Sequence, residues 1–205
     1  MTKVILVRHG QTQWNLDMKY QGHCDIELTE KGVEQAMLAA QRLAGENISA
    51  LYASDLSRAL KTAECIGAKH NLPVTAVPEL REINFGEWEG LTFESINSQS
   101  KDERSKLFTH PDEIIIPGGE TFRQVKERAI NAITKLVAQH PDQTIVIVSH
   151  GATIRTVLCA VLNIHLNHLW KIKQDNTAIN VLEYYDENVM VSLVNDAQHL
   201  NGTLL

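Results

Sequence analysis

The sequence has few cysteines and no long apolar run, and these gaps exclude several classes of protein. Its 205 residues contain three cysteines, Cys24, Cys65 and Cys159, which lie far apart and show no CxxC spacing. A disulfide framework is therefore excluded, and separated thiols in odd number fit a reducing compartment. No stretch approaches the roughly 20 apolar residues that cross a bilayer. Between Lys3 and Arg8 there are only four apolar residues, too few for a signal peptide, so we expect a cytoplasmic protein without membrane contact.

Positive charge is also scarce. The chain has 19 Lys and Arg against 25 Asp and Glu, a net charge of −6 at pH 7. Nucleic-acid-binding proteins usually present a basic face, so we expect no nucleic-acid partner. The apolar fraction of 43% is ordinary for a globular protein. The length, together with the absence of repeats and linkers, predicts a single domain over residues 1–205.

Metal-ligand spacing is missing as well. The sequence has nine histidines but no HExxH or equivalent cluster. The HxxH pair His165 and His168 lacks a supporting carboxylate, which favours a surface position. We therefore expect neither a metal nor a cofactor.

Apolar periodicity predicts strands that alternate with helices. The expected strands are 4–7, 48–53, 73–77 and 144–148, followed by a hairpin of 178–185 with 189–195. The expected helices are 29–44, one that begins after Ser54 or Asp55 as its cap, 120–139 and 152–162. This alternation predicts an α/β three-layer sandwich whose central, mainly parallel sheet is flanked by helices. The polar segment 83–119 interrupts it and is expected to form a small lid.

Two of the predicted strands end in the same way. Residues 4–7 run into Arg8 and His9, and residues 144–148 run into His150, with a glycine after each histidine. Ligands of open α/β sheets bind beyond the carboxyl ends of the strands. A lone histidine after a strand is more often structural than catalytic. Here the repeated setting predicts that the two imidazoles meet at one edge of a parallel sheet.

Arg58 is a third sign of a site, because it falls in the first turn of the helix after Ala53. Arginine usually stabilises helix C-termini, since the N-terminus is the positive end of the helix dipole. A cation at this end makes sense if an anion lies beside it, and helix N-termini bind phosphate through free N–H groups. With Arg8 and the two histidines, Arg58 would form a cationic pocket suited to phosphoryl transfer through a phosphohistidine. Glu79 and Glu82 are the candidates for a general acid.

Five motifs in register then point to a family. They are RHGQTQWN (8–15), QGHCDIELTEKGVEQA (21–36), SDLSRALKTAE (54–64), LREINFGEWEGLT (80–92) and VSHGATIRTVL (148–158). Together they resemble the histidine phosphatase superfamily in its phosphoglycerate mutase-like branch, over nearly the whole chain. The sequence departs from that pattern at Gln11, where glutamate is common, and at Glu27, where proline is common. Neither change is expected to remove the chemistry.

The resemblance implies a role for each matching residue. His9 would be the phosphorylated nucleophile and Arg8 a phosphate ligand, while Arg58 and His150 would complete the phosphate pocket. Glu82 would be the proton donor, and the resemblance alone selects it over Glu79. The substrate-binding residues that the resemblance implies are Asn15, the amide of Gly151, Gln21 and Gly22.

The function expected first is a phosphomonoesterase that acts on a small phosphorylated metabolite. Within the family, the chain resembles the α-ribazole phosphatase-type enzymes of cobalamin assembly and the broad-specificity phosphatases. A phosphoglycerate mutase is the alternative; the segment 83–119 is short for one and lacks paired arginines, although Lys101 and Arg104 could contact a carboxylate. A non-catalytic binding module of the same fold is the third interpretation. A homodimer is expected at the level of the family only.

Overall fold

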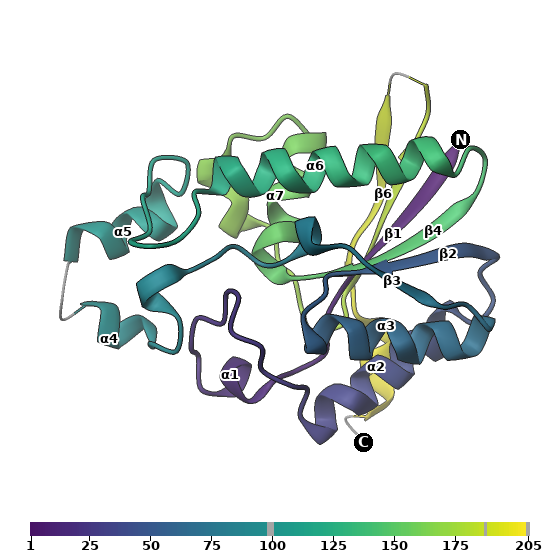
Figure 1. The fold of residues 1–205 in the computed structure, drawn as a ribbon, viewed down its shortest axis with the longest axis horizontal. Coiled ribbons are helices and arrows are strands. Elements are labelled where there is room, and N and C mark those ends of the chain that lie inside the picture. The colour runs from purple at the N-terminus through teal and green to yellow at the C-terminus, as the bar shows by residue number, and fades with distance from the viewer. Residues whose placement is uncertain (98–100, 187, 204–205) are drawn as a thin grey trace.

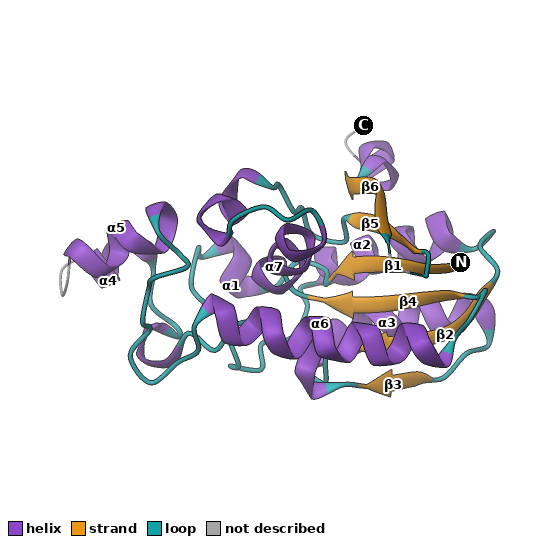
Figure 2. Ribbon diagram, turned by 90° about the horizontal axis from the view of Figure 1, so that it is seen from above, coloured by secondary structure: helices purple, strands orange, loops and turns teal. Residues whose placement is uncertain are grey.

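A computed structural model describes residues 1–97, 101–186 and 188–203 and shows three layers, with helices on both sides of a sheet (Figures 1 and 2). The strands are β1 (Thr2–Arg8), β2 (Ile48–Ala53), β3 (Val74–Ala76), β4 (Thr144–Ser149), β5 (Ile179–Tyr184) and β6 (Val189–Asp196). In the described residues they form one sheet in the order β3-β2-β4-β1-β5-β6. The first four strands run parallel, whereas β5 is antiparallel to both of its neighbours. The predicted α/β sandwich with a mainly parallel sheet is confirmed.

The helices follow the predicted alternation with strands. They are α1 (Gln13–Leu16), α2 (Glu30–Leu43), α3 (Ser57–His70), α4 (Phe93–Asn97), α5 (Lys101–Thr109), α6 (Phe122–Gln139) and α7 (Gly151–Val161). Short 3₁₀ turns lie at Pro78–Leu80, Gly86–Trp88, Leu166–Lys171 and Gln198–Thr203. Thr29 caps α2 by accepting a hydrogen bond from the Gly32 amide, which confirms the predicted start of that helix.

The two central strands are buried on both faces. In β1, Val4 and Leu6 pack in the cluster formed with α6 and α7, while Ile5 and Val7 pack against α2 and α3. The apolar residues of β4 alternate in the same way between these two clusters. Strands covered on both sides read as continuous apolar runs, which is why these segments lack the polar alternation of a half-exposed strand. The sheet therefore holds the residues that follow its strand ends in fixed positions.

The start of α3 differs from the prediction. Leu56 occupies the N-cap position of α3, and its side chain makes no capping hydrogen bond. The prediction that Ser54 or Asp55 caps this helix is therefore wrong. Both carboxylate oxygens of Asp55 bind the guanidinium group of Arg81 instead. The Ser57 amide donates to Asp25, a residue 32 positions earlier in the chain. A carboxylate from a distant loop therefore performs the capping that local sequence was expected to supply.

The segment 83–119 lies beyond the carboxyl ends of the parallel strands, where α4 and α5 are seen in Figure 2. Its buried side chains, among them Ile83, Trp88 and Leu107, form a third apolar cluster with the start of α6 and part of α7. The indole N–H of Trp170 donates to the Leu107 carbonyl at 2.6 Å and ties the segment to the turn at 166–171. Residues 98–100 of the predicted lid, and residue 187 in the turn of the predicted hairpin, lie outside the described residues.

Candidate active site

The carboxyl ends of β1 and β4 bring the two histidines together. The strands are hydrogen-bonded neighbours in which Arg8 pairs with Ser149. His9 and His150 follow, and their ring centroids lie 5.1 Å apart. Their exposed fractions are 3% and 0%. The imidazoles therefore meet at the edge of the sheet that the sequence predicts.

His9 is held in a form that can act as a nucleophile. Its Nδ1 lies 2.7 Å from the carbonyl oxygen of Gly10, and because a carbonyl only accepts, Nδ1 carries the proton. The other ring nitrogen, Nε2, then keeps its lone pair. Burial, and after it the positive charges of Arg58 and Arg8, hold the pKa of His9 well below its usual value near 6.5. The imidazole is consequently neutral at physiological pH.

His150 takes the opposite tautomer and serves as a donor. The Nε of Arg58 donates to Nδ1 of His150 at 3.3 Å, which leaves the proton of the neutral ring on Nε2. Burial first, and then the charge of Arg58, lower the pKa of His150 well below 6.5. The buried Nε2 has no hydrogen-bond partner among the described residues. An unpaired buried donor is costly, and a phosphoryl oxygen is a fitting acceptor for it.

Arg58 reaches the site from the first turn of α3 and is fixed by backbone carbonyls. Its Nη1 donates to Cys24 and its Nη2 to Gly22, both at 2.8 Å, and its exposed fraction is 1%. Gly22 was expected to border the substrate, but it is not among the described residues that line the cavity beside His9. It has a positive φ of 48°, and a Cβ there would collide with the carboxylate of Glu89. Gly22 therefore orients Arg58.

Arg8 is anchored on one side and open on the other. Its Nη1 donates to the Gln174 carbonyl at 2.7 Å. Its buried Nε has no partner within the described ranges. Burial first, and then the neighbouring cation Arg155, lower the pKa of Arg8 to about 10. Arg8 still carries its charge at neutral pH and is available to an anion.

Glu82 lies across the N-terminus of α7. Its Oε2 accepts from the Ala152 amide, and its Oε1 from the amide and hydroxyl of Thr153, at 3.0 to 3.1 Å. A carboxylate is stabilised at this positive end of a helix. The main-chain carbonyl of Glu82 accepts from Arg128, and the His23 ring nitrogen Nε2 lies 3.0 Å from it. Of the two candidate acids, Glu82 lines the cavity and Glu79 does not.

Asn15 and Gln21 share a support in Thr12. The side-chain oxygen of Asn15 accepts from the Thr12 amide and from the Asn176 side chain, at 3.0 and 3.2 Å. The side-chain oxygen of Gln21 accepts from the Thr12 hydroxyl at 2.9 Å. Because these oxygens are occupied, the amide nitrogens of both side chains are the groups left to donate to a ligand.

Most of these side chains line a cavity of about 140 Å³. The predicted residues that line it are Arg8, His9, Asn15, Gln21, Arg58, Glu82 and Gly151. His150 is fully buried and is not among the lining residues, although it contacts Arg58 and its ring lies beside that of His9. The other lining residues are Lys19, Tyr20, Phe85, Ala152, Arg155 and Trp170. Of these, only Trp170 is suggested by the sequence, as an aromatic residue that could stack on a substrate. Arg155 follows Gly151 by four residues, so it lies on the same face of α7. That spacing was the available signal for Arg155.

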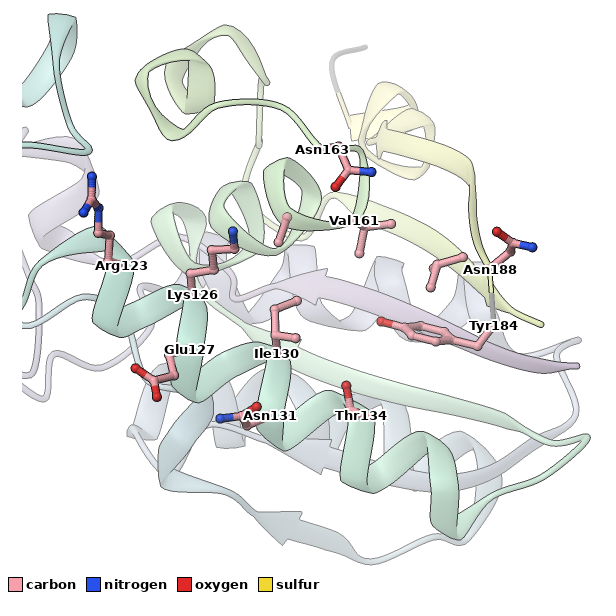
Figure 3. A pocket seen from close by; sticks show the side chains of 12 residues that line it. Arg123, Lys126, Glu127, Ile130, Asn131, Thr134, Val161, Asn163, Tyr184 and Asn188 are labelled. Atoms are coloured by element: carbon pink, nitrogen blue, oxygen red, sulfur yellow. The ribbon is translucent and has the colours of Figure 1, made fainter. Parts of the chain in front are cut away.

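A larger hollow lies elsewhere and gathers none of the predicted residues. It measures about 590 Å³ and lies between α6, α7 and the β5–β6 hairpin, with Lys126, Ile130 and Tyr184 among its walls (Figure 3). Arg123 at its end is paired with Asp112 at 2.6 Å. Size alone therefore does not select the functional site.

Within residues 1–97, 101–186 and 188–203, His, Cys, Asp and Glu side chains form no group of three or more that could hold a metal ion. No helix there is long and apolar enough to span a membrane.

Comparison with known proteins identifies the family of this chain. Residues 4–197 match the histidine phosphatase superfamily (branch 1). Phosphoserine phosphatase 1 of Hydrogenobacter thermophilus is 32% identical over 200 residues, which are 98% of this chain and 95% of that protein.

Two solved structures share both fold and length with the chain. YhfR of Bacillus stearothermophilus has a TM-score of 0.94 at 33% identity, with 98% of this chain and 100% of that chain covered. A phosphoserine phosphatase variant of Entamoeba histolytica, in complex with phosphoserine, has a TM-score of 0.88 at 35% identity with the same coverage.

The chain belongs to the histidine phosphatase superfamily. It is an enzyme of the phosphoric monoester hydrolase class, as the motifs predict.

Proposed function

We propose that the enzyme hydrolyses a small phosphorylated metabolite through a phosphohistidine on His9, without a metal ion. The observation that carries this proposal is the state of His9: buried, neutral, with Nε2 unprotonated, and beside two arginines. Unpaired donors on Arg8 and His150 support it, because no described residue satisfies them and a bound phosphoryl group offers acceptor oxygens. The substrate is a small molecule, in keeping with the volume of the cavity.

In the first half-reaction, His9 Nε2 attacks phosphorus and the bond from phosphorus to the leaving oxygen breaks. Glu82 takes up a proton as the phosphomonoester dianion binds beside it and gives that proton to the leaving oxygen, so that an alcohol leaves rather than an alkoxide. Arg8 and Arg58 stabilise the charge on the equatorial oxygens, and the His150 N–H donates to one of them. The product is phosphohistidine with a Glu82 carboxylate.

In the second half-reaction, water attacks phosphorus and the bond from phosphorus to nitrogen breaks. The Glu82 carboxylate accepts the proton of the water, which restores the acid for the next cycle. His9 returns to its neutral tautomer, still held by Gly10. Inorganic phosphate is the second product, so no co-reactant other than water is consumed.

A phosphoglycerate mutase would use the same phosphohistidine but return the group to a bound hydroxy acid. The expected carboxylate contacts of Lys101 and Arg104 cannot decide between the two reactions, because these side chains lie outside the described part. Purified enzyme incubated with 3-phosphoglycerate separates them. Release of inorganic phosphate faster than formation of 2-phosphoglycerate supports the phosphatase, and the reverse order overturns it.

The substrate is tested with a panel of phosphomonoesters in the presence of a chelator. Phosphoserine is included because relatives are named for it. α-Ribazole 5′-phosphate is included because the sequence resembles enzymes that use it, and p-nitrophenyl phosphate serves as the general substrate. We expect turnover that survives the chelator and an acid-labile phosphoenzyme. Activity lost with the chelator and restored by a divalent metal would contradict the proposal.

A further inference from the structure

The carboxylate of Glu89 joins two loops at the active site, and the mechanism above gives it no role. Its Oε1 accepts from the backbone amides of His23 and Phe85, at 2.7 and 3.1 Å, and its Oε2 accepts from the Cys24 amide at 3.0 Å. His23 and Cys24 precede Glu89 by 66 and 65 residues. Hydrogen bonds to an ionised acceptor are roughly twice as strong as those between neutral groups. One carboxylate therefore fixes two distant loops relative to each other.

The peptide unit between Gly22 and His23 links Glu89 to Arg58. Its N–H donates to Glu89 Oε1, and its carbonyl oxygen accepts from Nη2 of Arg58 at 2.8 Å. Cys24 is held in a similar way, because its N–H donates to Glu89 and its carbonyl accepts from Nη1 of Arg58 at 2.8 Å. Hydrogen bonds arranged in a chain polarise and strengthen one another. The carboxylate therefore orients the two carbonyls that hold the guanidinium group.

This indirect arrangement leaves part of Arg58 free to bind an anion. A guanidinium group has five N–H donors. Three of those of Arg58 meet the carbonyls of Gly22 and Cys24 and Nδ1 of His150, which leaves two. A carboxylate in direct contact with Arg58 would compete with phosphoryl oxygens for these two donors. A carboxylate that acts through the loop carbonyls orients the guanidinium group without occupying them.

We propose that Glu89 is a positioning residue for Arg58. Through the carbonyls of Gly22 and Cys24 it holds the guanidinium plane so that the two remaining donors face the equatorial oxygens of the phosphoryl group. Glu89 is not among the described residues that line the cavity, so it acts without touching the substrate. This inference rests on the proposed role of Arg58 in the phosphohistidine mechanism and adds a residue on which that role depends.

A double-mutant cycle on kcat/KM for p-nitrophenyl phosphate tests whether Glu89 acts through Arg58. The enzymes are the wild type, Glu89→Gln, Arg58→Ala and the double variant. Glutamine keeps one acceptor oxygen but turns an amide N–H₂ toward a backbone N–H, so the loop carbonyls should shift. For Glu89→Gln we expect kcat/KM to fall about tenfold, mainly in kcat, because Arg58 stabilises charge in the transition state. For Arg58→Ala we expect a fall of about 10²- to 10³-fold.

The double variant should lie within about threefold of Arg58→Ala, because no guanidinium group is left for Glu89 to position. The loss in Glu89→Gln should be the same for alkyl phosphates, since the phosphoryl group is common to both kinds of substrate. Glu87→Gln, which replaces an exposed carboxylate two residues earlier, is the control and should match the wild type. Each enzyme is assayed well below its thermal midpoint. If Glu89→Gln shows no cooperative thermal transition, Glu89→Asp, which keeps the charge but withdraws it from the amides, takes its place in the cycle.

Losses that multiply in the double variant would overturn the inference, since Glu89 would then act independently of Arg58. Wild-type activity in Glu89→Gln would overturn it as well. A loss confined to alkyl phosphates would do the same, because Glu89 would then act through Glu82. Failure of the proposed function looks different: in that case Arg58→Ala keeps the activity of the wild type, or the wild-type enzyme leaves p-nitrophenyl phosphate intact.

Discussion

The site is built from two different kinds of structure. At the phosphoryl end, His9, His150 and Arg58 lie at strand ends or in the first turn of a helix, and all three are almost fully buried. Of the other residues at the cavity, Tyr20 and Phe85 lie in loops, and Trp170 lies in a short 3₁₀ turn. Groups that must be positioned within fractions of an ångström benefit from rigid elements, whereas loops accept change readily. We therefore expect the first group to set the chemistry of the enzyme and the second group to set its selectivity.

Replacement of His9 by alanine tests the phosphoryl end most severely. We expect kcat/KM to fall by more than about 10⁴-fold with every substrate, because the attacking atom itself is removed. The acid-labile phosphoenzyme, measured after rapid quench with labelled substrate, should vanish. The exposed His168→Ala variant is the control and should keep both signals. Substantial turnover in His9→Ala would mean that another residue is the nucleophile.

Glu82 is proposed to protonate the leaving group, so the effect of its replacement should depend on that group. Glu82→Gln cannot supply a proton, and we expect kcat/KM to fall about 10²- to 10⁴-fold for alkyl phosphates. With p-nitrophenyl phosphate, whose leaving group needs little protonation, the fall should be below about tenfold. Glu79→Gln is the matched control, because Glu79 does not line the cavity. A loss that is the same for both kinds of substrate would assign Glu82 to binding rather than to proton transfer.

Arg128 on α6 should give a smaller effect of the same kind, because it positions Glu82 without touching the substrate. It donates to the carbonyls of Glu79, Arg81 and Glu82 and binds the carboxylate of Glu120. For Arg128→Gln we expect about a tenfold fall in kcat/KM with alkyl phosphates and little change with p-nitrophenyl phosphate.

The control for Arg128 is Arg123→Gln, five residues earlier on the same helix and paired at the surface with Asp112. Arg128→Lys should restore part of the loss, since a lysine can keep the charge beside Glu120 but not the fork. A uniform loss across leaving groups, together with a lower thermal midpoint, would reduce Arg128 to a stabilising role.

The phosphoryl end could be predicted from the sequence, and the reason is physical. Apolar runs over residues 4–7 and 144–148 require strands covered on both faces, and the histidines after them can only lie at the sheet edge. Arg58 was visible because a cation at a helix N-terminus is unusual. Each of these signals lies within a few residues of the side chain that it predicts.

The rest depends on contacts between distant segments. Asp55 did not cap α3 because Arg81 competes for its carboxylate and Asp25 replaces it. Gly22 was predicted at the substrate but serves Arg58, which only the folded chain brings to its carbonyl. Trp170 was recognisable as an aromatic residue that packs or stacks, but its place over Arg155 follows from the docking of a loop. Local patterns carry no information about such pairs.

The burial that distinguishes the phosphoryl end should also be visible in the pH dependence of stability. The folded-state pKa values of His9 and His150 are well below 6.5, whereas both histidines titrate near 6.5 in the unfolded chain. As the pH falls below 6.5, these two histidines therefore bind protons in the unfolded state but not in the folded state, and folding becomes less favourable. Between pH 6.5 and 5.5 each histidine should lower the free energy of unfolding by roughly 1 kcal/mol. Carboxylates with lowered pKa values, such as Asp55 and Glu120, lose their contribution only below about pH 4.5, whereas His199, whose pKa burial also lowers, adds to the slope in this window.

Urea unfolding of the His150→Asn variant at the two pH values isolates one of these histidines. We expect its stability to depend on pH less steeply than that of the wild type. The difference should be about half of the combined effect of His9 and His150, because only His9 of this pair still binds a proton on unfolding. His168→Asn, which replaces an exposed imidazole, should reproduce the wild-type slope. If His150→Asn keeps the full slope, His150 is protonated in the folded enzyme. Its Nδ1 could then no longer accept from Arg58, and the division of roles between a neutral donor, His150, and a neutral nucleophile, His9, would fail.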